Sequence, residues 1–162
     1  MEVIALVNGI QAVLDKKSNR IAGRLSKGVD LFQGIKEVCK KYGYQAAQFQ
    51  CLGSLEYATY VQLEKTAEGK LQYSSKIKSD TEVELLSGTG FVGLDLFGEL
   101  DVHFHGMFVD CNQHISGGHF LEGENPVAIT IEFILFPLED IDLKRGPDEI
   151  TQLPIFQFRE KE

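Results

Sequence analysis

The sequence lacks any apolar run long enough to cross a membrane as a helix, since no stretch approaches the ~20 apolar residues that a bilayer requires. The apolar residues 3–7 have no basic flank and are followed at once by Asn8 and Gly9, so no signal peptide is predicted. Internal repeats and low-complexity stretches are also missing. We therefore expect a protein without a membrane span, folded as a single domain over residues 1–162.

Cysteine and positive charge are both scarce. The three cysteines, Cys39, Cys51 and Cys111, form no C-x-x-C pair, and we expect each to be a free, mostly buried thiol, as suits a reducing cytoplasm. Lysine and arginine number 16 against 24 acidic residues, which gives a formal net charge of −8. This charge disfavours a dedicated nucleic-acid binder and also an anionic membrane surface as partner. The expected location is the cytoplasm.

One helix is predicted after residue 30. Apolar residues at positions 31, 35, 38 and 42 follow at spacings of four, three and four, which places them on one helix face. Asp30 is suited to be the N-cap, and Gln33 could complete a capping box. Gly43 is suited to end the helix in a left-handed conformation.

Most of the remaining chain is predicted to form strands. Asn8-Gly9 predicts a hairpin between residues 3–7 and 10–14. Further strands are expected at residues 21–25, 46–51, 55–63, 71–77, 83–86, 91–96, 100–109, 127–136 and 153–158. Glycine-containing segments at 53–54 and 88–90 are expected to interrupt strands, and the apolar strand 127–136 is expected to be buried on both faces. Many strands and one helix predict an α+β fold, in which the helix covers a mainly antiparallel sheet.

All four histidines lie between positions 103 and 119. Alternation along a strand places His103 and His105 on one face with Asp101, and leaves residues 100, 102 and 104 on the apolar face. The glycine pair at 117–118 lets the returning chain pass close to its neighbour, which brings His119 opposite the other two. Three imidazoles with an open fourth position are typical of a catalytic zinc site, and imidazole also suits iron, nickel or copper.

Other interpretations of this region stay open. The three histidines could be incidental surface residues near a hairpin, because short motifs often occur by chance. His114, beside Cys111, is interpreted as a solvated turn residue rather than a ligand. Asp101 or Asp110 could accept a hydrogen bond from the ring N–H of a histidine whose other ring nitrogen binds the metal, and so orient that ring.

Two charged residues elsewhere in the chain are candidates for ligand binding. Arg24 could bind a substrate carboxylate through two parallel hydrogen bonds near the metal, or it could form an ion pair with Glu84 or Asp101 at a subunit interface. Glu84 could act as a general acid or base if burial raises its pKa, or it could be an edge-strand carboxylate without a chemical role.

Four segments, taken in order, resemble the plants-and-prokaryotes-conserved (PPC) domain. The first two are Arg24-Leu25 with Gly28-Val29-Asp30-Leu31, and Leu52-Gly53-Ser54-Leu55 with Ala58. The third is the stretch ELLSGTG from Glu84 to Gly90, and the fourth combines His103-Phe104-His105, Asp110 and the stretch GGHFL at residues 117–121. The match covers residues 20–137 and leaves the N-terminal hairpin and the C-terminal tail outside it.

The resemblance implies an α+β domain with a strongly curved sheet that associates as a homotrimer. In prokaryotic members it implies a metal ion, usually taken as zinc, on histidines that match His103, His105 and His119. Plant members carry AT-hooks and bind DNA, but the nearest segment here, residues 144–147, is followed by two acidic residues and is interpreted as a charged surface turn. The fold is also similar to that of acetolactate decarboxylase, a zinc enzyme, which is an analogy of fold only.

Three functional hypotheses follow. The first is a metal-binding protein whose three-histidine site accepts a small anionic ligand or supports metal-assisted chemistry, with enzymatic activity left open. The second is a regulatory module that binds DNA or a protein partner, and the acidic net charge of −8 weighs against DNA. The third is a trimeric scaffold whose association covers exposed strand edges.

Overall fold

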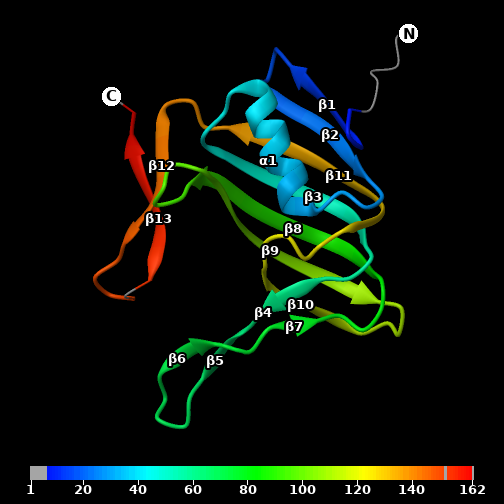
Figure 1. Cartoon of the computed structure of the whole chain (residues 1–162), viewed down its shortest axis with the longest axis vertical. Helices are drawn as coiled ribbons and strands as arrows, with labels where there is room; N and C mark the ends of the chain where they lie inside the picture. Colours follow the sequence, from blue (N-terminus) through cyan, green and yellow to red (C-terminus); the bar gives the residue numbers. More distant parts are fainter. Residues whose placement is uncertain (1–6, 152, 162) are drawn as a thin grey trace.

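Residues 7–151 and 153–161 are described by a computed structural model, in which they form one helix and a series of β-strands (Figure 1). In chain order the elements are β1 (Ile10–Asp15), β2 (Arg20–Ser26), α1 (Leu31–Tyr42), β3 (Ala47–Leu55), β4 (Thr59–Val61), β5 (Leu63–Lys65), β6 (Leu71–Tyr73), β7 (Ile77–Lys78), β8 (Val83–Leu94), β9 (Leu100–Asp110), β10 (Ile115–Phe120), β11 (Val127–Pro137), β12 (Ile141–Pro147) and β13 (Pro154–Glu160). Within these residues, no helix is long and apolar enough to cross a membrane.

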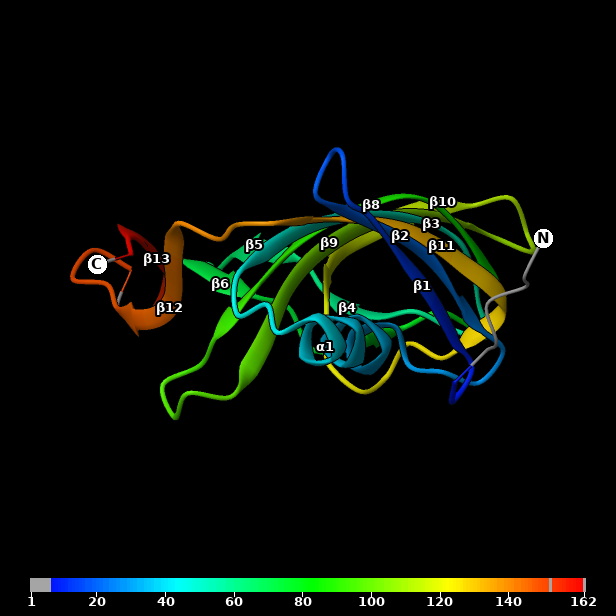
Figure 2. The ribbon, with the colours of Figure 1, turned by 90° about the horizontal axis from the view of Figure 1, so that it is seen from above.

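The strands form an 11-stranded sheet and a separate two-stranded sheet of β5 and β6. The main path of the large sheet runs β1-β2-β11-β3-β8-β9-β10-β4-β7, with antiparallel neighbours throughout. The β12–β13 hairpin joins it through one parallel bridge, between Lys144 and Leu94 of β8. Figure 2 shows α1 against one face of the sheet only. The predicted α+β class, with one helix and a mostly antiparallel sheet, is confirmed.

Four phenylalanines form the centre of the core between α1 and the sheet. Phe32 of α1, Phe49 of β3, Phe104 of β9 and Phe120 of β10 are each at most 1% exposed. The Phe104 ring contacts the other three, at centroid distances of 6.0, 5.4 and 5.3 Å respectively. This cluster fixes the inner face of β9, and therefore also the direction in which the outer face of β9 points.

The ends of α1 follow the sequence prediction in all but one detail. The Asp30 side chain accepts hydrogen bonds from the backbone N–H groups of Phe32 and Gln33, and Gly43 ends the helix at φ 75°. The Gln33 side chain does not reach back to complete a capping box, because it donates to Glu37 one turn further on. Helix start and end are therefore set by Asp30 and Gly43.

The N-terminal hairpin is partly described. Asn8 and Gly9 have φ values of 51° and 77°, which suit a type I′ turn, and Val7 and Ile10 exchange backbone hydrogen bonds across it. The predicted partner strand at residues 3–7 otherwise lies outside the described residues. The main partner of β1 is β2, in a register that pairs Ile10 with Leu25.

The two glycine segments do not interrupt strands. β3 continues through Gly53 with an irregular register, and a Cβ at this position would lie 2.1 Å from the Thr130 carbonyl oxygen of β11. β8 continues through Gly88, where a Cβ would lie 2.0 Å from Phe104 Cζ. Close packing within the sheet requires these glycines, so the predicted strand breaks are wrong.

β11 is buried on one face only. Ile131, Phe133 and Leu135 are at most 3% exposed, whereas Ile129 and Ile134 are 72% and 45% exposed. The prediction of burial on both faces is therefore wrong. The apolar run arises because the sheet face opposite α1 carries apolar side chains as well.

Two predictions about single segments also need correction. Residues 144–147 are not a surface turn but part of β12, paired with β13. All three cysteines are free, but only Cys39 and Cys51 are buried, and Cys111 is exposed. Burial raises the pKa of the Cys39 and Cys51 thiols to about 12, so neither is a thiolate at neutral pH.

Candidate metal centre

The alternation predicted along β9 is present. Val102 and Phe104 are 5% and 0% exposed and belong to the core. His103 and His105 occupy the opposite face of the strand, where His103 is half-buried and His105 is exposed. The two imidazoles therefore leave the same face of one strand, as the period of two requires.

β10 brings the third imidazole beside them. His119 pairs directly with His105 in the antiparallel register of β9 and β10. The glycine pair allows this close return, because a Cβ on Gly117 would lie 2.2 Å from the Gly106 carbonyl oxygen. A Cβ on Gly118 would lie 2.6 Å from a backbone oxygen of β4, on the other side of β10. The sequence prediction that the glycines permit close approach is confirmed.

The ring nitrogens of the three histidines converge. His103 Nε2 lies 3.1 Å from His105 Nε2, and His119 Nδ1 lies 3.3 Å from the same His105 atom. One ring nitrogen from each residue lies within 4.8 Å of the other two. In the part of the chain that the structure describes, no other group of three His, Cys, Asp or Glu side chains gathers in this way.

These separations fit a tetrahedral transition metal. Zn–N bonds of 2.0–2.1 Å in a tetrahedron place neighbouring nitrogens about 3.3 Å apart, close to the observed 3.1 and 3.3 Å. Hydrogen bonds between the rings account for at most one of these distances, because His105 Nε2 carries either one N–H or one lone pair. The donor set, three imidazoles without a carboxylate, is one of the sets found in catalytic zinc sites.

The environment keeps the three rings neutral at neutral pH. Burial is the main cause that lowers the pKa of His103 and His105 below the usual value for imidazole. Burial, together with the charges that His103, His105 and Arg145 would carry, lowers the pKa of His119 to about 4. Because metal ions bind neutral imidazole, the rings are in the protonation state that a metal needs.

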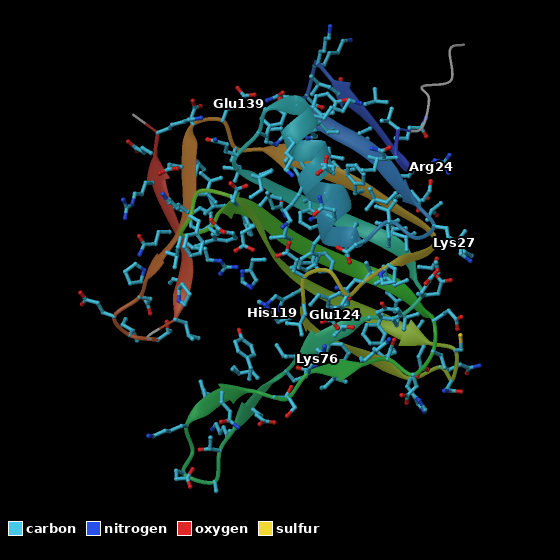
Figure 3. All side chains as sticks on the ribbon, viewed as in Figure 1. Arg24, Lys27, Lys76, His119, Glu124 and Glu139 are labelled. Carbon is cyan, nitrogen blue, oxygen red and sulfur yellow. The ribbon has the colours of Figure 1, made fainter. Side chains whose placement is uncertain are left out.

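Aromatic side chains from two hairpins border the cluster. The Tyr73 ring of β6 lies 5.5 Å from the His119 ring, between centroids. The Phe156 ring of β13 lies 6.4 Å from the His103 ring. In Figure 3 the labelled His119 points toward the space between the β5–β6 and β12–β13 hairpins.

Asp101 lies at the edge of the cluster, on the same face of β9 as the histidines. Its Oδ2 accepts a 2.6 Å hydrogen bond from Arg145 Nε, and its Oδ1 accepts one from the Val102 backbone. Its negative charge acts to raise the pKa of His103 and His119, against the stronger effect of burial. Asp101 therefore influences the rings through its charge, and its hydrogen bonds go to other groups.

Arg24 and Glu84 lie away from the cluster. Arg24 is on β2, well away from His119 in Figure 3 and four strand spacings from β9, or about 19 Å. Its Nε donates to Gln11 Oε1. Glu84 is exposed on β8, five positions from Thr89, which pairs with His105; this corresponds to roughly 17 Å along the strand. No contact joins either residue to the three rings, and Asp101 pairs with Arg145 rather than Arg24. Their suggested roles in ligand binding stay predictions.

Asp110 and His114 belong to the turn between β9 and β10. Asp110 Oδ1 accepts the backbone N–H groups of Asn112 and His114, and these bonds lower the pKa of its carboxyl. The side chain of His114 is 78% exposed and lies 3.5 Å from Asp110 Oδ2. Asp110 thus holds the turn that pairs β9 with β10, and neither residue is part of the three-histidine group.

Sequence reasoning missed three residues beside the cluster, namely Tyr73, Arg145 and Phe156. Each comes from a hairpin far along the chain from the histidines, so no local spacing indicates the contact. Arg145 and Phe156 face one another in the register of β12 and β13, which depends on a turn with no recognisable pairing signal.

Comparisons with known proteins agree with the fold. The profile of the Plants and Prokaryotes Conserved (PCC) domain matches residues 15–139, which confirms the resemblance noted in the sequence. A comparison with curated proteins finds no match.

Several solved structures share the fold. A putative DNA-binding protein from Bacteroides thetaiotaomicron has a TM-score of 0.76 at 14% identity, over 93% of this chain and 99% of its own. A metal-containing protein from Archaeoglobus fulgidus has a TM-score of 0.72 at 22% identity, over 97% and 99%. A plant- and prokaryote-conserved (PPC) protein from Pyrococcus horikoshii has a TM-score of 0.71 at 23% identity, over 97% and 100%.

Proposed function

Because the chain belongs to the Plants and Prokaryotes Conserved domain family, we propose that it binds a zinc-like divalent metal ion through His103, His105 and His119. One observation carries the proposal, the convergence of three ring nitrogens at separations of 3.1 and 3.3 Å. The lowered pKa of each ring supports it, because it removes the competing proton. The relative from Archaeoglobus fulgidus that is described as metal-containing also supports it.

The site suits an external ligand better than a purely structural ion. Structural zinc sites are closed by four protein ligands, whereas this group offers three. A bound zinc ion supplies Lewis-acid chemistry, which polarises an oxygen atom of a ligand at the open position. The protein itself supplies the neutral rings, the aromatic border and the charges of Asp101 and Arg145. We propose a small anionic ligand for the open side, and leave a reaction unassigned.

The metal content of the purified protein tests the proposal directly. After expression with zinc and dialysis against buffer, we expect about one zinc per chain, because three preorganised neutral ligands hold the ion without a folding step. Inductively coupled plasma mass spectrometry against a protein concentration from amino-acid analysis gives the ratio. A value below one-third zinc per chain, unchanged after incubation with zinc, cobalt and nickel in turn, would contradict the proposal.

A homotrimer, and the strong curvature of the sheet expected with it, remain proposals that the family resemblance suggests. The sheet face opposite α1 supports association, because Leu52, Leu86 and Ile134 line an open hollow of about 370 Å³ there and are 45–55% exposed. Covering such apolar surface stabilises an assembly. We expect a mass near three times the 18.1 kDa of the chain in light scattering coupled to size-exclusion chromatography. A monomer at micromolar concentration would contradict the assembly.

The alternative is a regulatory module that binds DNA or a protein partner. Two relatives of the same fold, from Bacteroides thetaiotaomicron and Ralstonia eutropha, are described as putative DNA-binding proteins. Against this, the net charge of −8 opposes a polyanion. A salt-titrated gel shift separates the two, since phosphate contacts impose a steep salt dependence on binding. The free thiols of the cysteines support the cytoplasm as the proposed location.

A further inference from the structure

The β12–β13 hairpin lies outside the residues that the family profile matches, yet it is held against β8, the neighbour of the histidine-bearing strand β9. Lys144 forms a bridge to Leu94 of β8, and the ring of Phe158 packs edge-on against Phe91 at 5.6 Å. Figure 1 shows this hairpin beside the ends of β8 and β9. The position of its side chains relative to the cluster is therefore set by packing at several points.

Arg145 is the charged side chain that this hairpin brings to the site. Its Nε donates to Asp101 Oδ2 at 2.6 Å, its Nη1 donates to the Pro154 carbonyl at 3.2 Å, and its guanidinium lies 4.2 Å from the centre of the Phe156 ring. The side chain is only 19% exposed. These contacts fix the plane of the guanidinium while engaging two of its five N–H groups.

Arg145 is linked to the histidines by its charge and by an aromatic ring that borders both. The Arg145 charge acts on both His103 and His119, where it contributes to lowering the pKa. The Phe156 ring centre lies 4.2 Å from the Arg145 guanidinium and 6.4 Å from the His103 ring centre, so Phe156 borders both groups. In the described structure, Arg145 Nη2 makes no hydrogen bond to protein.

The charges at the site favour an anion. The Asp101 carboxylate offsets the positive charge of Arg145. A divalent ion held by three neutral imidazoles would keep its charge of +2, because none of these ligands is negatively charged. No carboxylate of the described residues joins the ligand group. A carboxylate matches the planar fork of a guanidinium through two hydrogen bonds, and the rings of Tyr73 and Phe156 offer flat apolar contacts to the rest of a ligand.

We propose that Arg145 recognises the carboxylate of a small organic acid that binds at the open side of the metal, with Tyr73 and Phe156 contacting its apolar part. This inference rests on the proposed metal function and adds the ligand class to it. The competing explanation is that Arg145 only anchors the hairpin, through Asp101 and the Pro154 carbonyl.

Benzoate is a suitable probe, with benzamide as its uncharged counterpart. Each variant is first loaded with zinc and its zinc content measured, and each probe is then titrated into it by calorimetry. We expect benzoate to bind the wild-type protein and Arg145→Gln to weaken it about tenfold or more, since charge-assisted hydrogen bonds are lost. The matched control is Arg159→Gln, on the same hairpin, where the arginine is exposed and donates to Gln157; here benzoate binding stays unchanged. Benzamide binds none of them.

The zinc content separates failure of this inference from failure of the metal site. If wild-type protein holds no zinc, the proposed function fails and the ligand class fails with it. If Arg145→Gln holds zinc and binds benzoate as tightly as wild type, or if the zinc-loaded wild type binds no benzoate, the inference alone is overturned. If Arg145→Gln does not hold zinc, Arg145→Lys decides, because it keeps the charge without the planar fork. If Arg145→Lys holds a full complement of zinc, weaker benzoate binding than in the wild type supports the inference, and unchanged benzoate binding overturns it.

Discussion

Replacement of His105 by alanine is expected to abolish stoichiometric zinc binding. His105 Nε2 is the central atom of the group, 3.1 Å from the His103 nitrogen and 3.3 Å from the His119 nitrogen. Its removal leaves two ligands that no protein group can supplement, because no carboxylate or thiol joins the cluster in the described residues. Mutation of a residue that only hydrogen-bonds to a metal ligand typically lowers metal affinity about 10–100-fold. Loss of a direct ligand should cost more, so we expect zinc affinity to fall by more than about 100-fold. Competition with a chromophoric chelator measures it.

His114→Ala is the matched control for this experiment. It also removes one histidine, but from the β9–β10 turn, where the ring is 78% exposed and outside the cluster. Zinc affinity should match that of the wild type. Far-UV circular dichroism checks that His105→Ala is folded, which we expect because His105 is exposed and lies outside the core. Equal zinc affinity for His105→Ala and His114→Ala in folded proteins would exclude the three-histidine site.

The cluster could be predicted from the sequence because its geometry is local. Alternation along one strand fixes His103 and His105, and a short turn held by Asp110 fixes the register that brings His119 opposite them. The positions of Tyr73 and Arg145 depend instead on how two hairpins, one earlier in the chain than the histidines and one later, pack against the sheet. That packing is decided by contacts such as Phe91–Phe158, between residues that nothing in their own segments connects.

The predicted strand breaks at residues 53–54 and 88–90 are wrong for a different physical reason. Glycine within a strand can signal a turn or a close approach of another group, and the sequence does not distinguish them. At Gly88 in β8 the reason is a close approach, because the Phe104 ring occupies the space where a side chain would lie. Phe104 itself was correctly placed in the core by alternation. The sequence therefore predicts that the Phe104 ring lies in the core, but it does not show that Gly88 makes room for this ring rather than ending a strand.

Gly88→Ala is consequently expected to destabilise the protein, although alanine is usually tolerated better than glycine in a strand. The new Cβ would lie 2.0 Å from Phe104 Cζ. The ring cannot move aside easily, because it is stacked on Phe49 at 5.4 Å and packed edge-on against Phe120 at 5.3 Å. Overpacking of this kind costs about 1–3 kcal/mol. For a chain of this size the melting temperature should fall by roughly 2–12 °C, as measured by calorimetry.

Two further variants identify the cause of this loss. Ser87→Thr also adds one carbon to β8, but at an exposed neighbouring position, and should leave the melting temperature within about 2 °C of the wild type, as surface substitutions usually do. Phe104→Leu removes the ring, so Gly88→Ala should cost less in that background, giving a coupling of ~0.5–3 kcal/mol in a double-mutant cycle. Additive losses in the cycle would show that the glycine is required for some reason other than the ring.

The same variant should also affect the metal site. Because Phe104 lies between His103 and His105 on β9, displacement of its ring should weaken zinc binding in Gly88→Ala.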